Sequence, residues 1–232
     1  WMTSMPSNGP PDNNHLYRND SCNSCTQGAS STQAVCRCQF AVQYYANDSN
    51  QWNCNVSLHD NGGTALPGSQ IQYNDSDISA TSVTVTKLLA IDTGVLINYG
   101  NLSITQVSAE QIFNVTNVGN INMNLSLRGW GGENETGVNA INYTMICQFG
   151  NISWGNQRFD FGSEKTGATS FALMKNLTNQ TRQAANSTLP QRVDDTNFGS
   201  DRNSTIWRLQ VPLSVGGLCN GTIIFGAIDA EV

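Results

Sequence analysis

The chain has 232 residues, a formal net charge of −6, and 11 Lys and Arg residues, none of them in a run. Only 12% of its residues are charged, against about 25% in an ordinary soluble domain. This balance excludes a basic surface for phosphate backbones, so we expect no nucleic-acid partner. No apolar run approaches the roughly 20 residues of a membrane-spanning helix, and we expect no membrane insertion.

The N-terminal residues 1–31 are rich in Pro, Asn, Ser and Gly and lack apolar periodicity. This composition predicts an extended N-terminal arm before a folded domain over residues 32–232. The first ten residues have neither a basic start nor an apolar segment, so the chain is interpreted as a mature form. They cannot form the long apolar helix of type IV pilin-like filaments, and that class of filament is not expected.

A period-two pattern begins at residue 33. Apolar residues alternate over 36–44 and again over 52–58, with turn-forming residues at 46–50 between them. The pattern predicts an antiparallel hairpin with one buried face. Further strands are predicted at 82–90, 95–99, 110–117, 121–127, 140–149, 170–174, 205–212 and 221–227, and residues 172–185 are either a helix or a loop. About ten short strands joined by turn residues predict an all-β fold, an antiparallel β-sandwich or jelly roll.

The strongest signal is the number of N-glycosylation sequons, Asn-x-Ser/Thr with x other than Pro. Of the 29 Asn residues, 15 begin a sequon, whereas chance placement would give about 5. In strands, as at Asn114 and Asn124, the Asn must lie on the outward face for a glycan to fit. The predicted glycosylation sites are Asn19, Asn47, Asn55, Asn74, Asn101, Asn114, Asn124, Asn134, Asn142, Asn151, Asn176, Asn179, Asn186, Asn203 and Asn220.

The cysteines agree with an oxidising, extracellular compartment, in which disulfides are the default. Cys147 and Cys219 stand alone in two strand-like segments, so we expect them to pair across the domain. The other five are clustered before residue 55: Cys22, Cys25, Cys36, Cys38 and Cys54. Because the total is odd, one cysteine of the chain is left without a partner in the same chain. The alternative is a zinc site of Cys22-x-x-Cys25 with Cys36-x-Cys38, but zinc sites usually repeat C-x-x-C, and we expect no metal there.

Catalytic motifs are missing from the sequence. It contains two His residues, neither in a recognisable motif, and no Gly-x-Ser-x-Gly, His-Glu-x-x-His or phosphate loop. We therefore expect a protein that is not an enzyme and has no cofactor. Five aspartates in loops would suit a structural Ca²⁺ ion, although solvated turn residues are the simpler interpretation: Asp75, Asp77, Asp194, Asp195 and Asp201.

One segment resembles a known group of surface proteins. Residues 97–103 and 110–129 contain the turn Asn117-Val-Gly-Asn120 between alternating segments, with Gly119 suited to positive φ. Together with residues 207–212 and 219–226, they resemble archaeal secreted TasA- and camelysin-like β-sandwich proteins over about residues 80–230. That group includes subunits of bundling pili and biofilm fibres built by donor-strand exchange.

The resemblance implies a structural subunit of an extracellular, N-glycosylated cell-surface filament, with identical subunits as partners and a role in adhesion or biofilm. Residues 33–45 project apolar side chains to one side and are the expected donor strand, although the same segment also suits the local hairpin. The alternative function is a surface-displayed carbohydrate-binding or adhesive module, or an S-layer-like protein. Trp130 and Trp154, each beside a glycine, would form a sugar-stacking platform or pack in the core.

Overall fold

The structure is a computed structural model and describes residues 2–3, 14–17, 24–27, 34–37, 39–54, 82–161, 170–193, 199 and 201–230. The chain divides into two compact units, Trp1–Leu88 and Leu89–Val232. The described residues form strands, turns and three short 3-10 helices, and none of them is in an α-helix. The predicted all-β class is therefore confirmed. The predicted boundary between residues 31 and 32 lies outside the described residues.

The first unit contains two small antiparallel sheets. The larger has the strand order β2-β1-β5-β6, and the smaller joins β3 to β4. Tyr17 and Trp52 are buried with Ala46, and the two rings lie 5.5 Å apart between centroids. The strands are β1 (Met2–Thr3), β2 (Leu16–Tyr17), β3 (Ser24–Gln27), β4 (Ala34–Arg37), β5 (Ser49–Cys54) and β6 (Ser82–Val85).

The predicted hairpin between residues 36–44 and 52–58 is wrong. In the described part of these segments, β4 pairs with β3, whereas β5 pairs with β1 and β6. A period-two pattern shows which face of a strand is apolar but does not select the partner strand. The expected donor segment, residues 33–45, thus has partners within its own unit, because β4 is paired and Tyr45 is buried.

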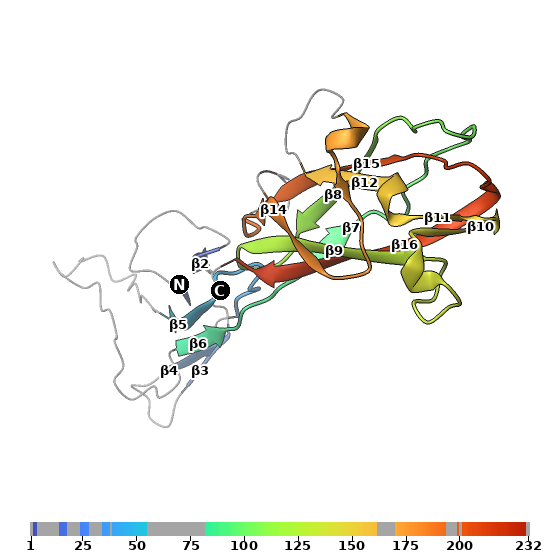
Figure 1. The fold of residues 1–232 in the computed structure, drawn as a ribbon. Coiled ribbons are helices and arrows are strands. Elements are labelled where there is room, and N and C mark those ends of the chain that lie inside the picture. Colours follow the sequence, from blue (N-terminus) through green and yellow to red (C-terminus); the bar gives the residue numbers. More distant parts are fainter. Residues whose placement is uncertain are drawn as a thin grey trace. The chain divides into compact units, whose positions relative to one another are not determined.

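The second unit is a sandwich of two five-stranded antiparallel sheets, as predicted (Figure 1). Sheet one has the order β11-β10-β16-β9-β14, and sheet two has the order β13-β12-β15-β8-β7. The strands are β7 (Ile91–Thr93), β8 (Gln111–Asn117), β9 (Met123–Gly131), β10 (Met145–Phe149), β11 (Asn151–Ile152), β12 (Gln157–Phe161), β13 (Lys175–Asn176), β14 (Arg182–Leu189), β15 (Arg202–Leu209) and β16 (Gly216–Asp229).

Aromatic rings from both sheets meet in the sandwich core. Phe113 of β8 stacks on Phe225 of β16 with 5.1 Å between centroids, and Trp207 of β15 contacts the rings of Phe159 and Phe225. Trp207 is fully buried. The two contacts of Phe225 cross from sheet one to sheet two and hold the layers together, whereas Phe159 and Trp207 are neighbours within sheet two.

Asn117 marks the place where the chain leaves one sheet for the other. The predicted hairpin around residues 117–120 is wrong, because β8 belongs to sheet two and β9 to sheet one. Gly119 is not among the described glycines with positive φ, which are Gly100, Gly132, Gly150 and Gly217. The Gly119 N–H instead donates to Asn117 Oδ1 at 2.7 Å. A side-chain hydrogen bond thus stabilises the turn without a left-handed residue.

Several other predicted elements need correction. Residues 95–99 form no strand, and residues 171–173 are a 3-10 helix where a strand was predicted at 170–174. The helix considered at 172–185 is absent, since β13 and the beginning of β14 lie within that range. Five strands of the sandwich were not predicted: β7, β11, β12, β13 and β14.

Candidate functional site

The outer edge of sheet two is incomplete along β8. β7 pairs with residues 115–117 of β8 and ends at Thr93. The chain then continues over residues 94–104 without strand structure. In the described part of the chain, no strand pairs with Gln111–Asn114 on this side. Such an edge offers backbone donors and acceptors to an added strand.

A cavity of about 140 Å³ lies beside this edge. Residues 93–97 and Tyr99 form one wall, and a Cβ at Gly94 would lie 2.9 Å from the Phe113 ring, so this segment crosses directly over that ring. We call the edge residues Gln111–Asn114, the segment 93–97 and this cavity the β8 edge site. The rest of the wall comes from both sheets, including Phe113, Met145, Gln157, Ile223 and Phe225.

Large apolar side chains of the β8 edge site lie in water. Val95 is fully exposed, Leu96 is 75% exposed and Ile112 is 68% exposed. Val95 and Leu96 line the cavity, whereas Ile112 lies on the opposite face of β8 from Phe113. Single exposed apolar residues are ordinary on protein surfaces, but adjacent ones beside a cavity are typical of an interaction site. The arrangement suits an extended peptide whose side chains would cover Val95 and Leu96.

Two polar residues of the cavity wall, Gln157 and Tyr99, belong to a short hydrogen-bond chain. Thr144 Oγ1 donates to Gln157 Oε1, and Gln157 Nε2 donates to the Tyr99 hydroxyl at 2.9 Å. Burial of the Tyr99 hydroxyl raises its pKa well above the usual value, and the hydrogen bond from Gln157 offsets this only in part. At a pH where the Tyr99 hydroxyl of the unfolded chain ionises, Tyr99 of the folded protein therefore stays protonated.

This shift predicts that the sandwich loses stability at alkaline pH. Above about pH 10, where an exposed tyrosine ionises, the unfolded state releases the Tyr99 proton and the folded state keeps it. The free energy of unfolding should then fall with pH, with a Tyr99 contribution of up to about 1.4 kcal/mol per pH unit. Urea unfolding between pH 9 and pH 11 measures the slope. Tyr99→Phe should reduce it, and a slope unchanged by this substitution would contradict the prediction.

The described sequons are mostly accessible. Asn101, Asn134, Asn142, Asn176 and Asn220 are exposed, and Asn47, Asn114, Asn124, Asn151 and Asn179 are partly exposed. Asn114 and Asn124 lie on the outward faces of their strands, as predicted, because the residues on both sides of each are core residues. Asn203 is different, since it is only 9% exposed and lies on the inner face of β15 with Thr205 and Trp207. The side chains of Asn19, Asn55, Asn74 and Asn186 lie outside the described part of the structure.

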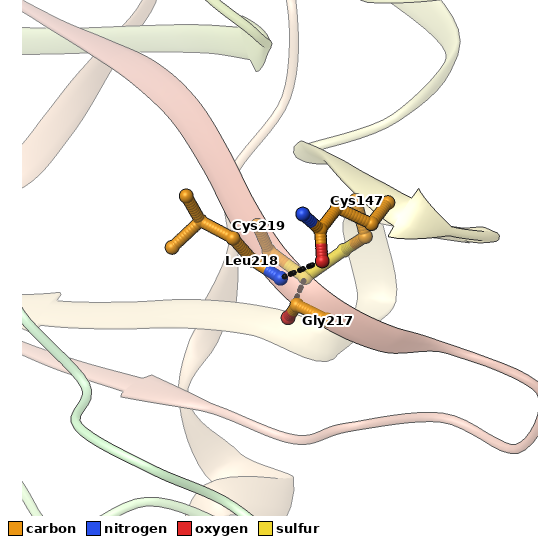
Figure 2. Close-up of a disulfide and its surroundings, with 5 residues drawn as sticks. Cys147, Gly217, Leu218 and Cys219 are labelled. Carbon is orange, nitrogen blue, oxygen red and sulfur yellow. Dashed lines mark hydrogen bonds between the residues drawn. A yellow bond between two sulfur atoms is a disulfide. The ribbon is translucent and has the colours of Figure 1, made fainter.

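The predicted disulfide between Cys147 and Cys219 is confirmed (Figure 2). The two residues are direct partners in the antiparallel ladder between β10 and β16. Beside the disulfide, the Leu218 N–H donates to Gln148 Oε1 at 3.2 Å. In the first unit, Cys25 of β3 and Cys36 of β4 are also register partners. Cys22 and Cys38 lie outside the described residues, and for Cys54 only its place in β5 is described.

The remaining candidate residues that the structure describes, Asp201, Trp130 and Trp154, make contacts within the fold. The carboxylate of Asp201 is buried with the Arg192 guanidinium 3.6 Å away, while Asp75, Asp77, Asp194 and Asp195 are outside the described ranges. Within those ranges, no group of three or more His, Cys, Asp and Glu side chains is placed to hold a metal ion. Trp130 is buried beside Arg128 and donates to Glu133 O at 3.4 Å, and Trp154 packs against the core.

Comparison of the chain with protein-family models and with curated proteins gives no match. No helix among the described residues is long and apolar enough to cross a membrane. The resemblance to TasA- and camelysin-like proteins thus stays a prediction from the sequence.

Proposed function

We propose that this protein is a structural subunit of an extracellular, N-glycosylated cell-surface filament and that identical subunits join by β-strand addition at the β8 edge site. The observation that carries the proposal is the stretch Gln111–Asn114, which has no strand partner on its outer side among the described residues and lies beside a cavity lined by both sheets. A strand added there would satisfy the backbone of β8 and place alternate side chains over the cavity. The disulfide within the sandwich agrees with an oxidising compartment.

Strand addition between identical chains joins two different surfaces, a donor segment and an acceptor edge. Such a head-to-tail contact does not close on itself in general, so it produces fibres rather than dimers. The acceptor is the β8 edge site, and the donor is an extended segment of a neighbouring copy. The filament would serve in adhesion or biofilm. A sugar-binding module is supported less well, because Trp130 is buried and Trp154 packs against the core.

Electron microscopy of the purified full-length protein tests this function. We expect the wild-type chain to form filaments and the double variant Val95→Lys/Ile112→Lys to stay monomeric, because two charges at the β8 edge site oppose strand addition. Both changed side chains are exposed, so the Tm should move by no more than about 2 °C. Leu173→Lys/Leu213→Lys is the matched control, with two exposed apolar residues outside the β8 edge site, and it should form filaments. Absence of filaments from the wild type would reject the function, and filaments from the edge variant would reject the site.

The glycoprotein part of the proposal predicts a mass well above that of the bare chain. We expect at least half of the 15 sequons to be occupied in protein from its native source, among them Asn134 in its exposed loop. Intact-mass spectrometry before and after chemical deglycosylation measures the difference. A native mass equal to the 25.1 kDa of the polypeptide would contradict this prediction.

A further inference from the structure

The fold places the sequons in two environments that differ at the hydroxyl residue two positions after the Asn. In the sequons of Asn101 and Asn134, both the Asn and the hydroxyl residue are exposed. In four others the hydroxyl residue is buried, namely Thr116 after Asn114, Ser126 after Asn124, Thr144 after Asn142 and Thr205 after Asn203. An enzyme that acts on the motif must contact both residues, because the hydroxyl is part of what defines a sequon.

The buried hydroxyl groups are held by neighbouring residues. Thr205 Oγ1 donates to Phe113 O at 2.9 Å and accepts from Trp207 Nε1 at 2.8 Å. Thr144 Oγ1 donates to Gln157 Oε1. Ser126 lies tightly against the opposite strand, because a Cβ at Gly226 would be 2.6 Å from its Oγ. In the folded sandwich these groups cannot turn toward an enzyme without a loss of core contacts.

The sequons of Asn114, Asn124 and Asn203 also have their backbone in the sheets, and that of Asn142 lies directly before β10. Asn124 pairs with β16 on one side and with β14 on the other. Asn203 and Asn114 lie in β15 and β8, which pair with each other along six residue pairs. The N–H of Thr144 donates to Ile152 O at 2.8 Å. β9 and β15 are paired on both sides, and release of such strands costs free energy close to that of global unfolding. The folded protein therefore exposes the sequons of Asn124 and Asn203 only rarely, and it exposes that of Asn114 only when β8 separates from β15.

We propose that the glycans of Asn114, Asn124 and Asn142 are transferred before the sandwich closes and that Asn203 carries no glycan in the native protein. Asn203 lies on the inner face of β15, so a chain modified there could not complete the sandwich. Glycan transfer by an oligosaccharyl transferase must therefore take place on the extended chain, before it folds. This inference rests on the N-glycosylation included in the proposed function.

The reaction itself needs an accessible Asn amide. Its Nδ2 displaces a phosphate group from the anomeric carbon of a glycosyl phosphate donor. The carbon–oxygen bond breaks with its electron pair on the phosphate, a nitrogen–carbon bond forms, and the amide gives up one proton to a base of the transferase. The Asn114 amide oxygen accepts from Ser204 Oγ at 2.7 Å and the Asn124 amide oxygen from Thr188 Oγ1 at 2.8 Å. Both amides are thereby held against a neighbouring strand of the folded sheet.

The test uses the full-length chain, produced without glycans and folded with its disulfide formed, together with a purified oligosaccharyl transferase and a synthetic lipid pyrophosphate-linked oligosaccharide. Synthetic peptides spanning residues 110–118, 120–128, 138–146 and 199–207 serve as unfolded acceptors. We expect all four peptides to be modified. In the folded protein Asn101 and Asn134 should be modified at peptide-like rates, while Asn114, Asn124, Asn142 and Asn203 should react on the order of 100-fold more slowly.

Modification of the folded protein at Asn114, Asn124 or Asn142 as fast as at Asn134 would overturn the proposed order. A glycan found at Asn203 in native material by peptide mapping would overturn the assignment of that site. A native protein without any glycan would instead refute the glycosylation in the proposed function, and the comparison of folded protein with peptides would still report which sequons the fold protects.

Discussion

Asn117→Ala is expected to lower the free energy of unfolding of the sandwich by about 3 to 4 kcal/mol. The Asn117 side chain is fully buried where β8 leaves sheet two. Its Nδ2 lies 2.9 Å from Ile121 O, 3.2 Å from Leu189 O and 2.9 Å from Pro190 O. Its Oδ1 accepts from the Gly119 N–H. Alanine would leave several backbone groups buried without a partner at the crossing between the sheets.

Equilibrium urea unfolding of the full-length chain, followed by near-ultraviolet circular dichroism, measures this loss. Asn122→Ala is the matched control, because Asn122 is exposed and its Oδ1 accepts one hydrogen bond, from the Gln191 N–H at 2.9 Å. The control should cost about 1 kcal/mol or less. Equal effects of the two variants would show that the buried amide of Asn117 does not hold the crossing.

Removal of the disulfide by Cys147→Ala/Cys219→Ala should destabilise the sandwich by about 4 kcal/mol. The bond joins residues 72 apart in sequence, so it excludes many extended conformations of the unfolded chain. Because the two cysteines are already register partners in the β10–β16 ladder, the folded sheet should keep its structure without the bond.

The wild-type protein under strong reducing conditions provides a second measurement of the same quantity. Its unfolding midpoint should move toward that of the double alanine variant. The variant has no Cys147–Cys219 bond to reduce, so reductant should not shift its midpoint through this site. A reduced wild type and a double variant that both unfold at the oxidised midpoint would contradict a stabilising role for Cys147–Cys219.

The fold class and the disulfide of the sandwich follow from local patterns in the sequence. Alternating apolar residues over 110–117 and 205–212 predicted β8 and β15, because residues two apart share one face of a strand. Two isolated cysteines in strand-like segments predicted the Cys147–Cys219 bond. The same alternation is present in Gln157–Phe161, where Phe159 and Phe161 lie in the core.

The choice of neighbouring strands and the inward orientation of the Asn203 sequon do not follow from local sequence, because both depend on contacts between distant residues. Alternation around residues 117–120 suits a hairpin and a crossing between sheets equally well, and the buried contacts of Asn117 with the distant Leu189 and Pro190 accompany the crossing. The Asn203 sequon has the same local pattern as that of Asn186, yet pairing with β8 turns Asn203 to the inner face. The local sequence specifies the period of a strand, whereas contacts with residues far along the chain select its partner and its buried side.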